Sequence, residues 1–188
     1  SLAWAGSTTV VVGQVSSGSG GGGNCSTQST VIDQTDVSGT SVLIASGTDS
    51  RGQSFTTTDA IDLYSISVYV ESEAMETGES GTITLRIGTG LDLSSSYLAE
   101  GTVTVANDTF SAGLYEVVFS EPVSLSATTT YYFACQWSLD KNDGIYADKS
   151  SNTDVLSGGD PLYNVSTGTF VMSKSAGYDL TFRTKKCD

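Results

Sequence analysis

Residues 81–88 read GTITLRIG, and this stretch decides the fold class. Its side chains alternate strictly: Ile83, Leu85 and Ile87 fall on one face, and Thr82, Thr84 and Arg86 fall on the other. A period of two is that of a β-strand with one buried and one solvated face, because successive strand residues point to opposite sides of a sheet. The stretch therefore predicts a half-buried strand rather than a helix.

Similar short runs rich in Val, Ile, Thr and Tyr recur along the chain, separated by clusters of Gly, Ser, Asn and Asp. No segment shows sustained helical periodicity, and 188 residues suffice for one sizeable core. This pattern predicts an all-β sandwich or barrel. The runs are SVLIAS from Ser41, GQSFTT from Gly52, IDLYSISVYVE from Ile61, YLAEGTVTV from Tyr97, GLYEVVFSEPVSL from Gly113, TTYYFACQWS from Thr129 and GYDLTFRT from Gly177.

Residues 16–24, SSGSGGGGN, divide the chain into three parts. Such a composition behaves as a flexible linker, so we predict a β segment at 1–15, the linker at 16–24 and one sandwich domain at 25–188. The apolar run STTVVVGQV at 7–15 is either an edge strand of that domain or the end of an oligomeric β stalk. Because a stalk would hide its apolar edges between copies, we expect a homotrimer that depends on residues before Ser16.

The formal net charge is −13, with a sequence pI near 4.1. Nucleic-acid binding needs clustered Lys and Arg, so this charge argues against a nucleic-acid partner and against anionic membrane surfaces. The longest apolar runs are far too short to cross a bilayer, so no membrane insertion is expected.

Three cysteines allow one disulfide and one free thiol. Cys135 lies in an aromatic strand and is expected to pack as a small buried hydrophobe. Cys25 and Cys187 lie in polar surroundings at the two ends of the post-linker segment, where they are either two free thiols or a disulfide. The predicted disulfide closes a loop of roughly 160 residues, worth about 5 kcal/mol in the chain-entropy model. It implies an oxidising compartment, and hence a secreted or cell-surface protein.

Histidine is absent, which excludes Ser-His and Cys-His nucleophiles and His-ligated zinc. A glycosidase built on two carboxylates remains an alternative, although alternation places Glu116 on a solvated face. The DKNDG stretch at 140–144 lacks the donor spacing of an EF-type calcium loop and favours a turn. No cofactor is expected, while a structural calcium elsewhere stays open and its ligands are unknown.

The order of the strand-like runs resembles a jelly-roll β-sandwich module of bacterial secreted and surface proteins, a family similar to carbohydrate-binding modules. The resemblance covers residues 52–184. It is carried by GQSFTT, IDLYSISVYVE, GTITLRI, YLAEGTVTV, YEVVFSEPVSLSATTTYYF, SGGDPLY and YDLTFRT. The chain departs from the family in its loops, in ATTT at 127–130, where a glycine turn is usual, and in its flanking cysteines. The resemblance implies a jelly roll, and it supports the fold more than the ligand.

A glycine-rich linker between a β stalk and a compact sandwich also resembles the tip of a trimeric adhesive fibre, as in phage tail fibres and the fibres of predatory bacteria. This likeness concerns organisation alone. Together the two resemblances imply a non-catalytic extracellular module for glycan recognition and adhesion, at the tip of a bacterial or phage surface fibre. The alternatives are a carbohydrate-binding module of a secreted polysaccharide-degrading enzyme, and a passive structural surface domain.

A glycan or cell-surface polysaccharide needs aromatic faces and planar polar side chains, and the polar region between Ser138 and Thr169 offers both. Tyr146 and Tyr163 lie beside Gly, Asp and Asn and are expected to be exposed. Trp137 is in phase with buried positions of its strand, which favours the core over the ligand site. The predicted ligand-binding residues are Trp137, Tyr146, Asp148, Lys149, Asn152, Asp160 and Tyr163.

Two arginines outside that region also fall in outward strand positions. Arg86 and Arg183 occupy the solvated phase of their strands. We therefore expect that they can share one face of the sandwich.

Overall fold

The computed structural model describes residues 25–34, 42–44, 49–139, 141–147, 159–164, 169–175 and 179–188. Within these ranges the chain forms strands and two short 3₁₀ turns, and no α-helix. The predicted β segment at 1–15 and linker at 16–24 lie outside them. The elements are β1 (Gln28–Gln34), β2 (Val42–Ile44), β3 (Ser50–Thr56), β4 (Ile61–Glu73), β5 (Ser80–Gly88), β6 (Ala99–Ala106), η1 (Asn107–Thr109), β7 (Gly113–Leu125), β8 (Thr130–Trp137), η2 (Lys141–Asp143), β9 (Ile145–Ala147), β10 (Pro161–Asn164), β11 (Ser173–Lys174) and β12 (Phe182–Cys187).

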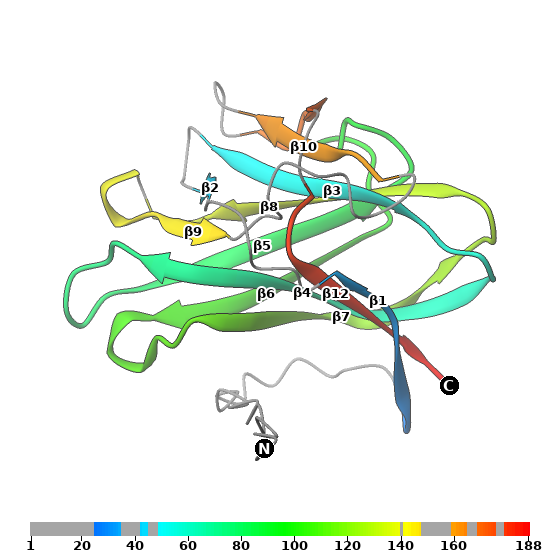
Figure 1. The fold of residues 1–188 in the computed structure, drawn as a ribbon, viewed down its shortest axis with the longest axis horizontal. Coiled ribbons are helices and arrows are strands. Elements are labelled where there is room, and N and C mark those ends of the chain that lie inside the picture. The colour runs from blue at the N-terminus through cyan, green and yellow to red at the C-terminus, as the bar shows by residue number, and fades with distance from the viewer. Residues whose placement is uncertain are drawn as a thin grey trace, which may run out of the picture.

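The strands form two antiparallel sheets that pack together as a sandwich, which confirms the predicted all-β class. The first sheet has the order β1-β12-β4-β9-β2, with β7 also paired to β4. The second sheet has the order β11-β10-β3-β8-β5-β6. Strands β1 and β12 lie side by side although they are the first and last strands of the described residues (Figure 1).

The main core fills the space between the sheets with alternate residues of each strand, as the period of two predicts. Ile83, Leu85 and Ile87 of β5 are fully buried, while Thr82 and the other intervening residues are partly exposed. The aromatic centre of this core comprises Phe55 of β3, Phe119 of β7, Phe133 of β8 and Phe182 of β12.

Trp137 ends β8 inside this core, with 2 % of its surface exposed. Its indole Nε1 donates a hydrogen bond to the Asp143 carbonyl oxygen (2.7 Å), which satisfies the one polar atom of the ring. The ring packs directly on Gly81, where a side chain would overlap with it. The indole therefore serves as core, the role that its strand phase favours, and is not accessible for ligand stacking.

The edge strands β6 and β7 approach each other closely across the two sheets. Gly101 of β6 makes this approach feasible, because a Cβ there would lie 2.6 Å from Val117 and 3.1 Å from the Val118 carbonyl oxygen. Strand β7 also bulges: residues 119–122 are unpaired opposite the single residue Tyr64 of β4. The bulged segment borders a hollow between the edges of β6 and β7.

A disulfide links Cys25 to Cys187, with a Cα–Cα distance of 5.4 Å, and confirms the predicted pairing. It joins the start of the described chain to the end of β12, 162 residues later, beside the paired strands β1 and β12. Cys135 is a free, buried cysteine, and burial raises the pKa of its thiol. The reactive thiolate is thereby suppressed.

The expectation that Arg86 and Arg183 share one face is wrong. Arg86 lies on β5 of the second sheet, whereas Arg183 lies on β12 of the first. Arg183 forms a two-pronged ion pair with Asp33 of β1, with both N–O distances 3.0 Å. Because both side chains point outward from different layers, they occupy opposite outer faces.

Replacement of Gly81 by alanine tests the packing of Trp137. The added methyl group must displace a buried indole ring, so we expect the variant to lose about 1–3 kcal/mol of unfolding free energy. Urea denaturation measures this loss. Gly90→Ala is the matched control, because nothing lies within 4 Å of its added Cβ. Equal stabilities of the two variants would contradict the packing described.

Selective reduction of the Cys25–Cys187 disulfide tests its contribution to stability. Loss of the Cys25–Cys187 bond is expected to lower the unfolding free energy by about 2–5 kcal/mol, since it frees a long loop in the unfolded chain.

In the oxidised native protein, Cys135 should resist iodoacetamide and become labelled only in denaturant. Non-reducing peptide mapping that links Cys135 to either partner would contradict the assignment.

Candidate ligand-binding surface

A second apolar cluster lies on the outer face of the second sheet, outside the main core. Ala134 of β8 and Leu162 of β10 form its floor, because both occupy the phase that points away from the main core. Leu93, Phe170 and Met172 cover this floor, and each is at most 4 % exposed. The outer face of this sheet is therefore partly covered by two chain segments, residues 89–98 and residues 169–175.

These two segments are tied to each other by backbone hydrogen bonds. The Leu93 amide donates to the Phe170 carbonyl oxygen (2.9 Å), and the Met172 amide donates to the Leu91 carbonyl oxygen (2.8 Å). The buried side chain of Asn164 donates to the carbonyl oxygens of Thr169 (3.1 Å) and Val171 (2.8 Å). The cover is thus a hydrogen-bonded layer anchored on β10.

The turn at Asp92 is held by its own carboxylate. The hydrogen bonds that it accepts from the Ser95 hydroxyl and from the amides of Ser94 and Ser95 lower the pKa of Asp92. The hydroxyl of Ser94 in turn accepts a hydrogen bond from the Phe170 amide (3.0 Å). This serine-rich turn therefore joins the two covering segments.

Arg86 is the residue around which this surface is organised. Its guanidinium lies between the rings of Tyr97 and Phe170, with its central carbon 4.5 Å and 4.3 Å from the two ring centroids. Its Nε donates to Glu100 Oε2 (2.7 Å), and its Nη1 donates to the Leu93 carbonyl oxygen (3.2 Å). A planar cation held on both faces and at its edge fixes the orientation of Tyr97.

Tyr97 combines this fixed orientation with exposure. Among the described residues, the exposed large hydrophobic side chains are Tyr97 (45 %), Leu98 (51 %) and Val171 (49 %). Tyr97 and Leu98 are neighbours in one covering segment, and Val171 follows Phe170 in the other. We call Tyr97, Leu98 and Val171, together with Arg86, the aromatic platform.

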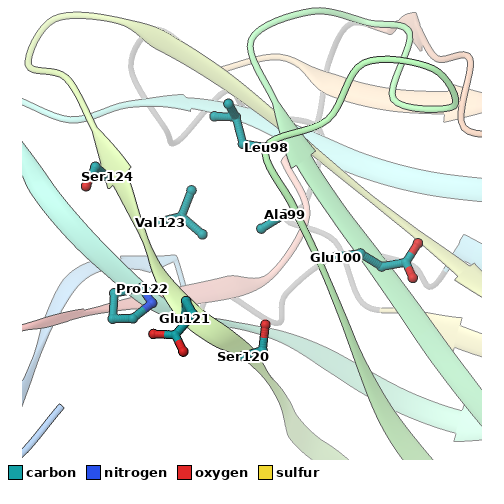
Figure 2. A pocket seen from close by; sticks show the side chains of 8 residues that line it. All are labelled: Leu98, Ala99, Glu100, Ser120, Glu121, Pro122, Val123 and Ser124. Carbon is teal, nitrogen blue, oxygen red and sulfur yellow. The ribbon is translucent and has the colours of Figure 1, made fainter. Parts of the chain in front are cut away.

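A hollow of about 390 Å³ adjoins the platform at the edge of the sandwich, between β6 and the bulge of β7 (Figure 2). Ala99 and Val123 point toward each other across it, whereas the carboxylates of Glu100 and Glu121 point away from each other. Its lining is mixed in polarity. The lining residues are Leu98, Ala99, Glu100, Ser120, Glu121, Pro122, Val123 and Ser124.

The structure does not bring the sequence-predicted tyrosines together on one sheet. Tyr146 lies on β9 of the first sheet, opposite Leu43 and Ser72, and is half-buried. Tyr163 lies on β10 of the second sheet, opposite Arg51, and is also half-buried. Their role in binding stays a prediction, as does that of Asp148, Lys149 and Asn152, which lie outside the described residues.

Asp160 is described, and it has a structural partner. Its carboxylate pairs with Lys174 Nζ (2.6 Å), and this hydrogen bond raises the pKa of the lysine. The same ammonium lies 5.7 Å from the centre of the Tyr132 ring. Asp160 therefore helps to hold β11 and the covering segment beside the sheet.

Tyr97 was not among the ligand-binding residues predicted from the sequence, although one feature of the sequence pointed to its exposure. Tyr97 and Leu98 are an apolar pair at the end of a serine-rich stretch, LDLSSSYL, where nothing in the local pattern buries them. The partner that fixes Tyr97 is Arg86, eleven residues earlier on the preceding strand. A pairing across that loop is not visible in strand periodicity.

The described residues contain no group of three or more Cys, Asp or Glu side chains placed to hold a metal ion. Among them there is also no helix of the length and hydrophobicity needed to span a membrane. A scan of protein-family models and a search of curated proteins find no match to this chain.

Proposed function

We propose that this chain is a non-catalytic glycan-recognition module that binds its ligand on the aromatic platform. The observation that carries the proposal is the exposed Tyr97 ring, held in place by the Arg86 guanidinium. An aromatic ring fixed before binding offers a flat apolar face to the C–H groups of a sugar ring without a large loss of side-chain entropy. In the adjoining hollow the carboxylate of Glu121 can accept hydrogen bonds from sugar hydroxyls, and the hydroxyl of Ser120 can accept and donate them.

The strand order supports a jelly-roll connectivity, which we include in the proposal. Among the described residues, eight strands have six residues or more: β1, β3, β4, β5, β6, β7, β8 and β12. Numbered one to eight along the chain, they pair in the orders 1-8-3-6 (β1-β12-β4-β7) and 2-7-4-5 (β3-β8-β5-β6). Each sheet thus alternates strands from the two halves of the chain, as two interlocked Greek keys do.

The carboxylates near the site favour binding over hydrolysis. A glycosidase needs two carboxyl groups that face the scissile bond from opposite sides. Glu100 is engaged by Arg86 and points away from Glu121. Glu116, on β7 of the other sheet, accepts a hydrogen bond from the Ser65 hydroxyl (2.6 Å) and pairs with Lys185 Nζ (3.0 Å). Glu100 and Glu116 therefore serve as structural partners in the proposed module.

The Cys25–Cys187 disulfide supports an extracellular or cell-surface location, because such bonds persist in oxidising compartments. In the proposed protein the sandwich is the recognition head of an adhesive fibre, displayed on the linker. The stalk and homotrimer predicted for residues 1–15 stay predictions, since that part lies outside the described ranges.

A glycan array probed with the wild-type chain and with Tyr97→Ala tests the proposal. We expect selective binding by the wild type, and affinity for the best hit about tenfold weaker in the variant, because a central stacking contact is removed. The comparison variants are Tyr146→Ala and Tyr163→Ala, with folding of all three verified by thermal melting. Loss of binding in these two but not in Tyr97→Ala would move the site to β9 and β10.

The same array distinguishes the alternatives. A chain that binds no glycan at all would contradict the proposal and favour a passive structural domain. Reproducible release of reducing ends from a bound polysaccharide would show that the chain is an enzyme.

A further inference from the structure

The outer face of the second sheet continues beyond the aromatic platform as a strip of uncharged polar side chains. The strip residues alternate with core residues of β5, β6 and β8, so they point outward, and all are partly or fully exposed. They lie in register, with Thr82 opposite Thr104 and Thr84 opposite both Thr102 and Gln136. We call this set the threonine strip: Thr82, Thr84, Thr102, Thr104, Gln136 and Ser138.

The threonine hydroxyls of the strip are available to a ligand. Within the described part of the chain, the hydroxyls of Thr82, Thr84, Thr102 and Thr104 make no hydrogen bond to the protein. At the other end of the same outer face, Thr56 and Thr130 form a cross-strand pair whose hydroxyls bond to each other (3.2 Å). The four threonines of the strip therefore present a regular set of hydroxyl donors and acceptors, spaced by about 4.8 Å across strands and about 6.7 Å along them.

The strip is electrically neutral within a strongly acidic protein. None of its six residues carries a charge, although the chain has a net charge of −13. At one end of the strip, the charged residues Arg86 and Glu100 form an ion pair and neutralise each other. A neutral ligand can approach this face without the desolvation cost of buried charge, whereas the net charge repels a polyanion.

The strip and the aromatic platform form one continuous surface. Arg86, which lies over the Tyr97 ring, follows the outward neighbours Thr84 and Thr82 by two and four positions on β5. Glu100 precedes Thr102 and Thr104 by two and four positions on the antiparallel strand β6, so the two rows run side by side. The distance from Arg86 to Thr82 along the strand is about 13 Å, which together with Tyr97 exceeds the size of one sugar ring.

We propose that the ligand is an extended, uncharged polysaccharide chain that lies along β5 and β6, with one sugar on Tyr97 and the following sugars on the threonine strip. This inference rests on the proposed function and adds the chemical class of the ligand and its direction on the sheet. Free hydroxyls at a regular spacing suit a regular polymer of hydroxyl-bearing rings, and the absence of charge on the strip selects against uronic-acid polymers.

Calorimetric titration with neutral oligosaccharides of two lengths tests the inference. The probes are cellohexaose, xylohexaose and mannohexaose, each compared with its disaccharide. We expect a hexasaccharide to bind the wild type about tenfold or more tightly than its disaccharide, because two or more further hydrogen bonds form on the strip. In the double variant Thr84→Val, Thr102→Val this difference should vanish while the disaccharide affinity stays unchanged.

Valine preserves the branched shape and strand propensity of threonine, and a thermal melt checks the fold. The single variant Thr102→Val, at an exposed position of an edge strand, serves if the double variant is unstable, and Thr56→Val is the control on the same outer face. Equal affinities of the wild type for disaccharide and hexasaccharide, or unchanged hexasaccharide binding by the double variant, would show that the strip does not contact the ligand. Neither result would affect the proposed role of Tyr97. Binding of polygalacturonate without binding of any neutral hexasaccharide would overturn the ligand class, whereas no binding across the glycan array would overturn the proposed function itself.

Discussion

The interaction on which the candidate surface depends is the stacking of the Arg86 guanidinium between Tyr97 and Phe170. Arg86 comes from the regular strand β5, whereas the two rings come from covering segments that have little regular structure of their own. A guanidinium can serve both rings and also donate in its own plane, to Glu100 and to the Leu93 carbonyl oxygen. Lysine, with one compact ammonium group, could not make this set of contacts. The rigid sheet thereby determines the position of an otherwise irregular, exposed surface.

The second sheet carries this surface because both of its faces are used. Its inner face contributes to the main core, and part of its outer face holds the small cluster of Leu93, Ala134, Leu162, Phe170 and Met172. Burial of this cluster holds the covering segments against one part of the outer face. The uncovered part of that face lies beside the exposed apolar side chains of these segments. Tyr97, Leu98 and Val171 of the platform belong to the covering segments, whereas the threonine strip belongs to the uncovered part of the sheet. Loop residues held on a rigid scaffold are a common location for binding sites.

Much of the fold could be predicted from the sequence, because it depends on local patterns. The alternation of residues 81–88 gave the buried and exposed faces of β5, and the phase of Trp137 indicated its burial. The polar surroundings of Cys25 and Cys187 indicated their pairing. Each of these features depends on the residue's own strand or on the chain ends, so a period of two and a count of cysteines suffice.

The site could not be predicted in the same way, because it depends on which strands become neighbours. Arg86 and Arg183 both point outward from their strands, yet they lie on different sheets. The phase of a residue within its strand does not determine which sheet the strand joins. Tyr146 and Tyr163 both lie in the polar region between Ser138 and Thr169, yet strand pairing places Tyr146 on the first sheet and Tyr163 on the second. Tyr97 is fixed by Arg86 and by a segment more than seventy residues later that supplies Phe170, a tertiary arrangement with no local signature.

Mapping of chemical-shift changes by two-dimensional NMR, during titration with the tightest-binding oligosaccharide, would show directly whether the ligand lies on the aromatic platform and the threonine strip. We expect the largest backbone amide changes on Tyr97, Leu98 and Val171 of the platform and on Thr84 and Thr102 of the strip, on one continuous face of the second sheet. Changes concentrated instead around Tyr146 on β9 or Tyr163 on β10, with Tyr97 and the strip unaffected, would contradict this expectation.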